Sequence, residues 1–208
     1  MLQTKTIEPG TLSILKKLMK IPEFQSFNLV GGTALALKYG HRTSVDLDLF
    51  STENFDHQAT IEILQKNFGD SFTYDGDFSK WGIFCFIDGV KLDLVYYPHP
   101  MLYPFELWDT IRIYDDRDVI AMKIQAILGR GKKKDFWDIA ELMEYYDLSQ
   151  MIGFHKAKYP NQMLLISIPT AIVYFDDANN SNDPVSLKGQ TWDKIQSKIR
   201  SKVREFLS

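Results

Sequence analysis

Residues 31–50 read GGTALALKYGHRTSVDLDLF, and the surrounding chain is best understood from this stretch. The short apolar run FNLV before it is typical of a buried strand. The segment TALALKYG predicts a short helix that ends at Gly40. The segment SVDLDLF alternates apolar and acidic residues with a period of two, as a half-buried strand does. We therefore expect a strand, a glycine turn, a helix and a second strand in that order.

Three aspartates on two expected strands are candidate metal ligands. In a strand, Asp46 and Asp48 point to one face, while Val45 and the two leucines that alternate with the acids face the core. Asp93 in KLDLV shows the same alternation, so the three carboxylates converge if the strands are neighbours. Close like charges need a neutralising cation, and Mg²⁺ (or Mn²⁺) prefers carboxylate, water and phosphate oxygens. A DxD pair by itself more often lies on a solvated face of a sheet, so the surrounding residues decide whether these aspartates are metal ligands.

The turn Gly31–Thr33 supplies that context. Glycines let the backbone approach a phosphate closely, the following helix N-terminus offers free N–H groups, and the Thr33 hydroxyl adds a donor. A Gly-Gly-Thr sequence alone is usually only a turn. Here a single helix leads from the turn to Asp46, so we expect the phosphate-binding turn to lie beside the acids.

The composition is that of an ordinary globular protein. The chain has 208 residues, of which 45% are hydrophobic and 25% charged. A net charge of −3 gives no general attraction to nucleic acid, so an anionic partner needs a local basic patch. The single cysteine, Cys85, excludes an intrachain disulfide. No apolar stretch is long enough to cross a membrane, and we expect a cytoplasmic protein.

The remaining pattern predicts an α+β fold whose later half is mostly helical. Asp88-Gly89 is a strong hairpin signal between two strand-like runs. We expect helices at 11–20, 57–69, 117–129, 135–146, within 148–175 and at 191–207, and strands at 71–78, 81–88 and 90–97. The segments 98–109 and 176–184 are expected loops. We predict a catalytic α/β domain at 1–110 and a helical domain at 111–208 that completes the active site.

The stretch 31–50 resembles the AbiEii/AbiGii toxin family of nucleotidyltransferases, which belongs to the DNA polymerase β-like superfamily. Three later segments share the resemblance, namely KLDLV, DVIAMKIQAILGRGKKKDFWD and YFDDANNSNDP. The resemblance runs from about residue 25 to the C-terminus. It implies a nucleotidyltransferase-like mixed sheet with flanking helices and metal-dependent transfer of NMP from an NTP to an acceptor hydroxyl. It also implies a toxin of an abortive-infection or type IV toxin–antitoxin system with a separately encoded antitoxin. GTP as the NTP and the 3′ end of tRNA as the acceptor are further implications.

The resemblance gives roles to the motifs near the N-terminus. Gly32 and Thr33 match the nucleotide-phosphate motif, in which Ser is commoner than Thr, and Gly31 precedes them in the same expected nucleotide-binding turn. Asp46 and Asp48 match the metal pair. The second-motif acid falls on Asp93, which would act as general base on the acceptor hydroxyl and is a third candidate metal ligand.

Two later motifs add a lysine and an acid. Lys123 follows Asp118 by five residues and could neutralise triphosphate charge. The fourth-motif acid falls on Asp138, with Asp135 as its rival. Purely structural readings are also open, because Asp118 and Asp135 suit a helix N-terminus. Lys134 and Asp138 suit an i,i+4 surface pair worth about 0.3–0.5 kcal/mol.

Basic residues indicate where anionic ligands could bind. Arg42 in GHR could contact phosphate or hold the acidic strand, and His41 is expected at a helix end rather than on a metal. If the acceptor is RNA, two basic stretches are expected to touch its backbone, although most such runs are solvated faces. They comprise Arg130, Lys132, Lys133 and Lys134, and Lys194, Lys198, Arg200, Lys202 and Arg204 of the last helix.

Two other functions use the same residues. One is a non-catalytic nucleotide- or RNA-binding regulator, although such a module has no need of three uncompensated carboxylates. The other is a metal-dependent phosphodiesterase, although the four histidines are scattered rather than clustered.

Overall fold

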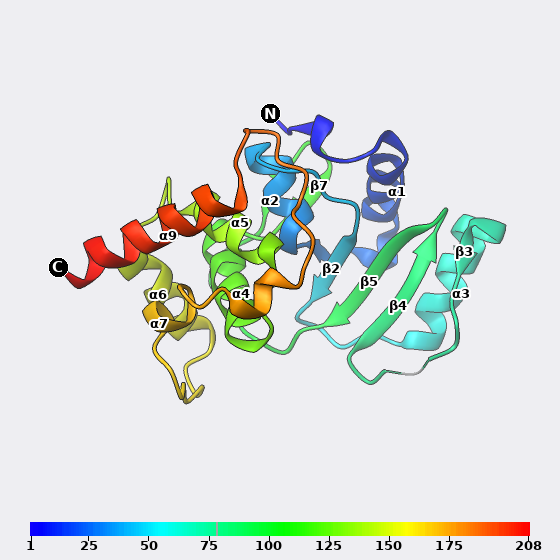
Figure 1. Ribbon diagram of the computed structural model, residues 1–208. Helices are drawn as coiled ribbons and strands as arrows, with labels where there is room; N and C mark the ends of the chain where they lie inside the picture. The colour runs from blue at the N-terminus through cyan, green and yellow to red at the C-terminus, as the bar shows by residue number, and fades with distance from the viewer. Residues whose placement is uncertain (78) are drawn as a thin grey trace.

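A seven-stranded mixed sheet with helices packed around it forms the framework of the protein (Figure 1). The computed structural model describes residues 1–77 and 79–208. In these residues the strand order is β3-β4-β5-β2-β1-β7-β6. The strands are β1 (Asn28–Leu29), β2 (Leu47–Ser51), β3 (Phe72–Thr73), β4 (Gly82–Ile87), β5 (Val90–Tyr96), β6 (Glu106–Trp108) and β7 (Ile111–Ile113).

The helices are distributed along the whole chain. They are α1 (Pro9–Lys20), α2 (Gly31–Tyr39), α3 (His57–Phe68), α4 (Asp116–Gly129), α5 (Lys133–Leu142), α6 (Leu148–Lys158), α7 (Ile168–Ala171), α8 (Asp176–Asn179) and α9 (Trp192–Leu207), with the short 3₁₀ helices η1 (Thr4–Thr6), η2 (Pro22–Phe24) and η3 (Gly69–Ser71). The predicted α+β class and the mixed sheet with flanking helices are thereby confirmed. No helix in the described part of the chain has the length and apolar character that a membrane span requires.

The decisive stretch folds as the sequence predicts, with one exception. Helix α2 ends at Gly40, which adopts φ of +64° as a left-handed C-cap. Leucines of β2 are buried, as expected. The prediction for Val45 is wrong, since its side chain is 61% exposed. The reason is that β2 begins only at Leu47, so the alternation of the strand does not extend to Val45.

The outer strands confirm the predicted hairpin and correct two boundaries. Asp88 and Gly89 join β4 to β5 with positive φ angles of 49° and 76°, as a tight primed turn requires. The strand expected at 71–78 is reduced to β3, and Phe78 of that prediction lies outside the described residues. The expected loop 98–109 contains β6, which pairs with β7 at the sheet edge.

The C-terminal half is helical, as predicted, with local differences. The expected helix within 148–175 is two helices, α6 and α7, and the expected loop 176–184 begins with the short helix α8. Ile195, Ile199 and Val203 of α9 are buried, and Trp192 stacks on Trp137 of α5. Helices α4, α5, α6 and α9 surround one apolar cluster, whereas α1, α3 and the sheet surround another.

The C-terminal half also contributes to the sheet. Strand β7 pairs in parallel with β1, so the chain after residue 110 completes the sheet before it becomes helical. The division into domains 1–110 and 111–208 stays a prediction.

Candidate active site

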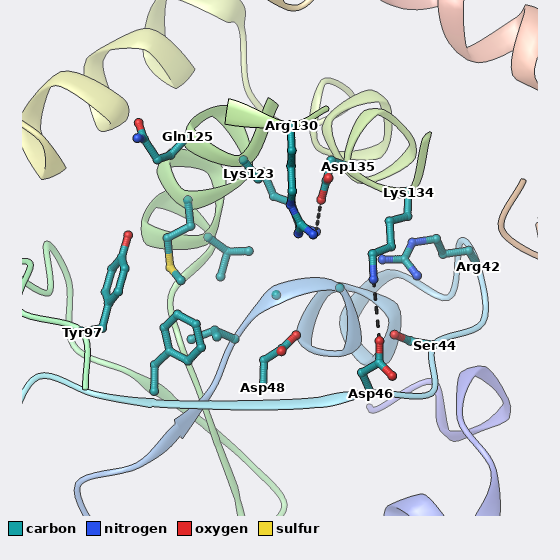
Figure 2. Close-up of a pocket in the computed structure, with 17 residues that line it drawn as sticks. Arg42, Ser44, Asp46, Asp48, Tyr97, Lys123, Gln125, Arg130, Lys134 and Asp135 are labelled. Carbon is teal, nitrogen blue, oxygen red and sulfur yellow. Dashed lines mark hydrogen bonds and ion pairs between the residues drawn. The ribbon is translucent and has the colours of Figure 1, made fainter. Parts of the chain in front are cut away.

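A cleft of about 290 Å³ lies where the start of α2 and the acidic strand β2 meet α4 and α5 (Figure 2). One wall carries carboxylates and the opposite wall carries basic side chains, as Figure 2 shows. The lining residues are Val30, Gly31, Gly32, Arg42, Ser44, Asp46, Asp48, Phe50, Tyr97, Val119, Met122, Lys123, Gln125, Ala126, Arg130, Lys134 and Asp135.

The two glycines allow charged side chains to approach the backbone. Gly31 has φ of +71°, and a Cβ placed there would lie 2.8 Å from Asp48 Oδ2. A Cβ on Gly32 would lie 2.1 Å from Arg42 Nη2, which is far inside van der Waals contact. Glycine is therefore needed at both positions to leave room for the carboxylate of Asp48 and the guanidinium group of Arg42, as well as for any phosphate.

Asp48 and Asp93 are direct neighbours across two strands. They form a register pair in the parallel ladder between β2 and β5, so their side chains share one face of the sheet. Burial and the nearby carboxylate of Asp93 raise the pKa of Asp48. Asp93 accepts a hydrogen bond from Lys91 through Oδ2, while its buried Oδ1 has no hydrogen-bond partner in residues 1–77 and 79–208. This pair carries negative charge that its surroundings compensate only in part.

Asp46 lies at the mouth of the cleft, and Thr33 holds its backbone. The Asp46 side chain is 35% exposed and lies 3.6 Å from Lys134 Nζ. The buried Thr33 hydroxyl donates to the Asp46 carbonyl and lies 2.8 Å from Ser44 Oγ. Ser44 lines the cleft, whereas Thr33 does not. The structure thus gives Thr33 a positioning role, and its donation to phosphate stays a prediction.

Asp138 is the centre of a buried ionic network behind the cleft. It is 0% exposed and accepts from Arg42 Nε at 2.7 Å and Nη2 at 2.9 Å. His41 Nε2 lies 2.8 Å away and Lys123 Nζ 2.6 Å away. Burial alone would raise the pKa of Asp138, but Arg42 and Lys123 hold it well below its usual range. The reading as a surface pair with Lys134 is wrong, because the folded chain buries Asp138.

Lys123 joins this network to the cleft. Its Nζ binds Asp135 at 3.0 Å as well as Asp138, and both Lys123 and Asp135 line the cleft whereas Asp138 does not. Burial disfavours the charged form, yet the two carboxylates raise the pKa of Lys123 above its ordinary value. Asp135 also accepts from the Lys132 backbone N–H at 3.3 Å, so it caps α5 at the same time. The two rival acids therefore have different roles, one in the cleft wall and one behind it.

Asp118 lies outside the cleft. Its carboxylate accepts the backbone N–H of Leu102 at 3.0 Å and of Tyr103 at 3.1 Å. Lys158 Nζ approaches it to 2.5 Å, and both of these charged side chains are fully buried. Asp118 therefore anchors the segment before β6 to α4 and α6, which is a structural role.

The site contains features that the sequence reading did not single out. Tyr97 and Gln125 lie at one end of the cleft (Figure 2), where the Phe50 ring centroid is 5.2 Å from that of Tyr97, and the lining also includes the apolar side chain of Met122. Only their position in the fold brings these residues together. Arg130 and Lys134, expected on an RNA backbone, line the cleft itself. Their position suits a small anionic ligand in the cleft.

The donor chemistry fits a hard divalent cation, although no complete ligand set is formed in advance. Among residues 1–77 and 79–208, no three His, Cys, Asp or Glu side chains are grouped closely enough to hold a metal ion. Asp48 and Asp93 lie side by side, whereas Asp46 lies near Lys134 and Asp93 binds Lys91, so the three carboxylates as common ligands of one ion stay a prediction. Mg²⁺ commonly uses only one or two carboxylates together with water and substrate phosphates. The unpartnered Asp93 oxygen and the raised pKa of Asp48 suit such an ion.

Comparison with solved structures finds a similar fold in two bacterial proteins, and the second of them confirms the expected nucleotidyltransferase-like architecture. JHP933 from Helicobacter pylori has a TM-score of 0.58 and 17% identity, with 96% of this chain and 92% of that chain covered. MenT4, a nucleotidyltransferase toxin from Mycobacterium tuberculosis H37Rv, has a TM-score of 0.59 and 14% identity, with 91% of this chain and 82% of that chain covered.

Sequence comparison then gives the family. The family model described as nucleotidyl transferase AbiEii toxin, type IV TA system, matches residues 13–200. An uncharacterized protein from Aquifex aeolicus (strain VF5) is 32% identical over 199 residues, covering 93% of this chain and 94% of the relative. The chain belongs to the AbiEii family of type IV nucleotidyltransferase toxins.

Proposed function

We propose that this cleft transfers a nucleoside monophosphate from an NTP to an acceptor hydroxyl. The observation that carries the proposal is the arrangement of Asp46 and Asp48 on one wall opposite Lys123, Arg130 and Lys134 on the other (Figure 2). A triphosphate placed between the walls would meet basic groups on one side. On the other side it would meet carboxylates that need a cation. Electrostatic stabilisation of this kind is the main contribution of proteins to phosphoryl transfer.

The shape of the cleft orients the substrate. The triphosphate would lie at the charged end, while the nucleoside would lie toward Phe50, Tyr97 and Met122, whose apolar surfaces suit a base and a ribose. Lys123 keeps its charge because Asp135 and Asp138 stabilise it. It can therefore face a phosphate oxygen with its remaining N–H group.

In the reaction, the acceptor hydroxyl loses its proton to Asp93, and its oxygen forms a bond to the α-phosphorus. The bond between the α-phosphorus and the bridging oxygen breaks, and pyrophosphate leaves. Asp46 and Asp48, with Asp93 adjacent, would hold Mg²⁺ or Mn²⁺, which when bound offsets charge on the carboxylates and the phosphates. Arg130 and Lys134 neutralise charge on the departing pyrophosphate.

The identity of the substrates completes the proposal. The family's place in type IV toxin–antitoxin systems supports a toxic activity and a separately encoded antitoxin as partner. By resemblance to the family, we propose GTP among the NTP substrates and the 3′ end of tRNA as the acceptor.

Label transfer tests the proposal directly. The protein is incubated with each α-labelled NTP, Mg²⁺ and total cellular RNA, and labelled RNA is the expected product. We expect Asp48→Asn to lower the transfer rate about 100-fold or more, because it removes a carboxylate from the cation site. The matched control Asp88→Asn, at the exposed hairpin tip, should transfer label like the unmodified protein. RNA breakdown without label would indicate a phosphodiesterase, and neither product would indicate a binding-only regulator.

A further inference from the structure

Two exposed aromatic side chains lie one strand beyond the proposed general base. Phe84 and Phe86 of β4 are 45% and 42% exposed, which is unusual for such large rings. The residues that alternate with them, Ile83, Cys85 and Ile87, are buried in the cluster that α3 shares. Because alternate strand residues point to opposite faces, both rings stand on the face opposite α3. In Figure 1 α3 lies behind β4, and no helix of the described part of the chain covers the near face of that strand.

The strand register places these rings in line with the acids. Asp93 pairs with Asp48 of β2 on one side and with Phe84 of β4 on the other. Asp48, Asp93 and Phe84 therefore form one row across three adjacent strands. Strands are about 4.7–4.9 Å apart, so the row spans about 10 Å from the acid of the cleft to the first ring. Phe86 stands opposite Lys91 in the next row.

A basic group lies beside these rings. Lys91, which stands opposite Phe86, has 43% of its side chain exposed. The face thus carries two flat rings with a lysine beside them, and such groups bind single-stranded nucleic acid through base stacking and phosphate contacts.

We propose that Phe84 and Phe86 form a stacking platform for unpaired bases at the 3′ end of the RNA acceptor. The inference rests on the proposed function, because the platform adjoins the side chain that would take the proton of the acceptor hydroxyl. A strand that stacks on Phe84 is led across Asp93 to the cleft. This continuity favours RNA over a protein partner as the occupant of the face, and the antitoxin becomes the alternative outcome of the test.

The test measures RNA binding and transfer kinetics separately. Binding of a fluorescein-labelled single-stranded oligo(A) RNA is followed by anisotropy for the intact chain and for Phe84→Ala, Phe86→Ala and the double variant. Each lost stacking contact should raise the Kd at least about fivefold, and the double variant about 25-fold. The KM for RNA should rise in parallel, while the KM for NTP and kcat stay unchanged.

Matched variants keep the result interpretable. Phe206 on α9 is 41% exposed, and Phe206→Ala should leave the Kd unchanged. Phe84→Tyr keeps the ring and should bind like the unmodified protein. If the double alanine variant unfolds, Phe84→Thr with Phe86→Thr removes both rings and keeps β propensity.

The outcomes separate the platform from the reaction. A Kd that the double variant does not change overturns the platform, and so does an unmodified protein that binds no RNA. Lost antitoxin capture with intact RNA binding overturns it in favour of a protein-docking face. Weakened RNA binding in the ring variants, with no label transfer by the unmodified protein, supports the platform and refutes the proposed transfer.

Discussion

Replacing Asp138 by Asn should destabilise the protein by about 3–5 kcal/mol, because it removes one charge from a buried network and leaves its partners. In the folded protein Asp138 is fully buried and neutralises Arg42 through two hydrogen bonds of 2.7 and 2.9 Å. It also lies 2.6 Å from Lys123 Nζ. Lys123 retains Asp135 after the substitution, whereas Arg42 loses its carboxylate partner, so most of the cost arises at Arg42.

Urea unfolding followed by far-UV circular dichroism measures this loss. The matched control Glu144→Gln removes a carboxylate that pairs with Lys198 on the surface, and exposed pairs contribute only about 0–1 kcal/mol. We expect a large fall in the urea midpoint for Asp138→Asn and almost none for Glu144→Gln. Equal small effects in the two variants would refute the reasoning that Asp138 acts as the buried counterion.

The contribution of Asp138 to stability should also depend on pH in a defined direction. The pKa of Asp138 in the folded chain is far below its value in the unfolded chain, since Arg42 and Lys123 favour the carboxylate. A carboxyl group with a lowered pKa stabilises the fold at pH values above the pKa that it has in the unfolded chain. This contribution is lost as the pH falls through the pKa that the group has in the folded chain. The difference in unfolding free energy between the unmodified protein and Asp138→Asn should therefore be constant from neutral pH down to about pH 4, near the pKa of Asp in the unfolded chain. It should shrink only below that value.

Two further predictions concern backbone space and a buried histidine. Gly32→Ala should cost about 1–3 kcal/mol and weaken NTP binding, because its Cβ would lie 2.1 Å from Arg42 Nη2. By contrast, Gly153→Ala in α6 meets nothing within 4 Å and should stabilise the fold by about 0.5–1 kcal/mol. Thermal unfolding checks both. Burial lowers the pKa of His155 to about 4, so the unfolded chain takes up the proton first and stability falls between about pH 6.5 and pH 4. The full shift corresponds to about 3 kcal/mol, which partial solvent screening reduces to about 2, and His155→Gln should lack this part of the slope. An unchanged slope would contradict the neutral state of His155.

Much of the fold follows from local patterns. The helix that ends at Gly40, the leucines buried in β2 and the Asp88-Gly89 hairpin depend on backbone preferences and period-two alternation, which neighbouring residues determine. Strand β6 was not predicted, because a three-residue edge strand within a proline-containing segment has no periodicity of its own. Its pairing with β7 decides its conformation.

The candidate site was predictable only in part. The sequence indicates Asp46, Asp48 and Asp93 because alternation shows which residues share a face of one strand. It does not show the environment of a side chain. Asp138 has the spacing of a surface pair, yet Arg42 from a distant segment turns it into a buried counterion. The two residues are 96 positions apart, so no local pattern could predict this pair.

The sequence by itself determined the order of the parts: a glycine turn, a helix, an acidic strand and a hairpin with a third acid. Tertiary structure alone decided which groups face one another. It placed Arg130 and Lys134 in the cleft and Phe84 in line with Asp93. The physical reason is that alternation fixes the face of a residue within its own strand, whereas register and helix packing fix its neighbours on other elements.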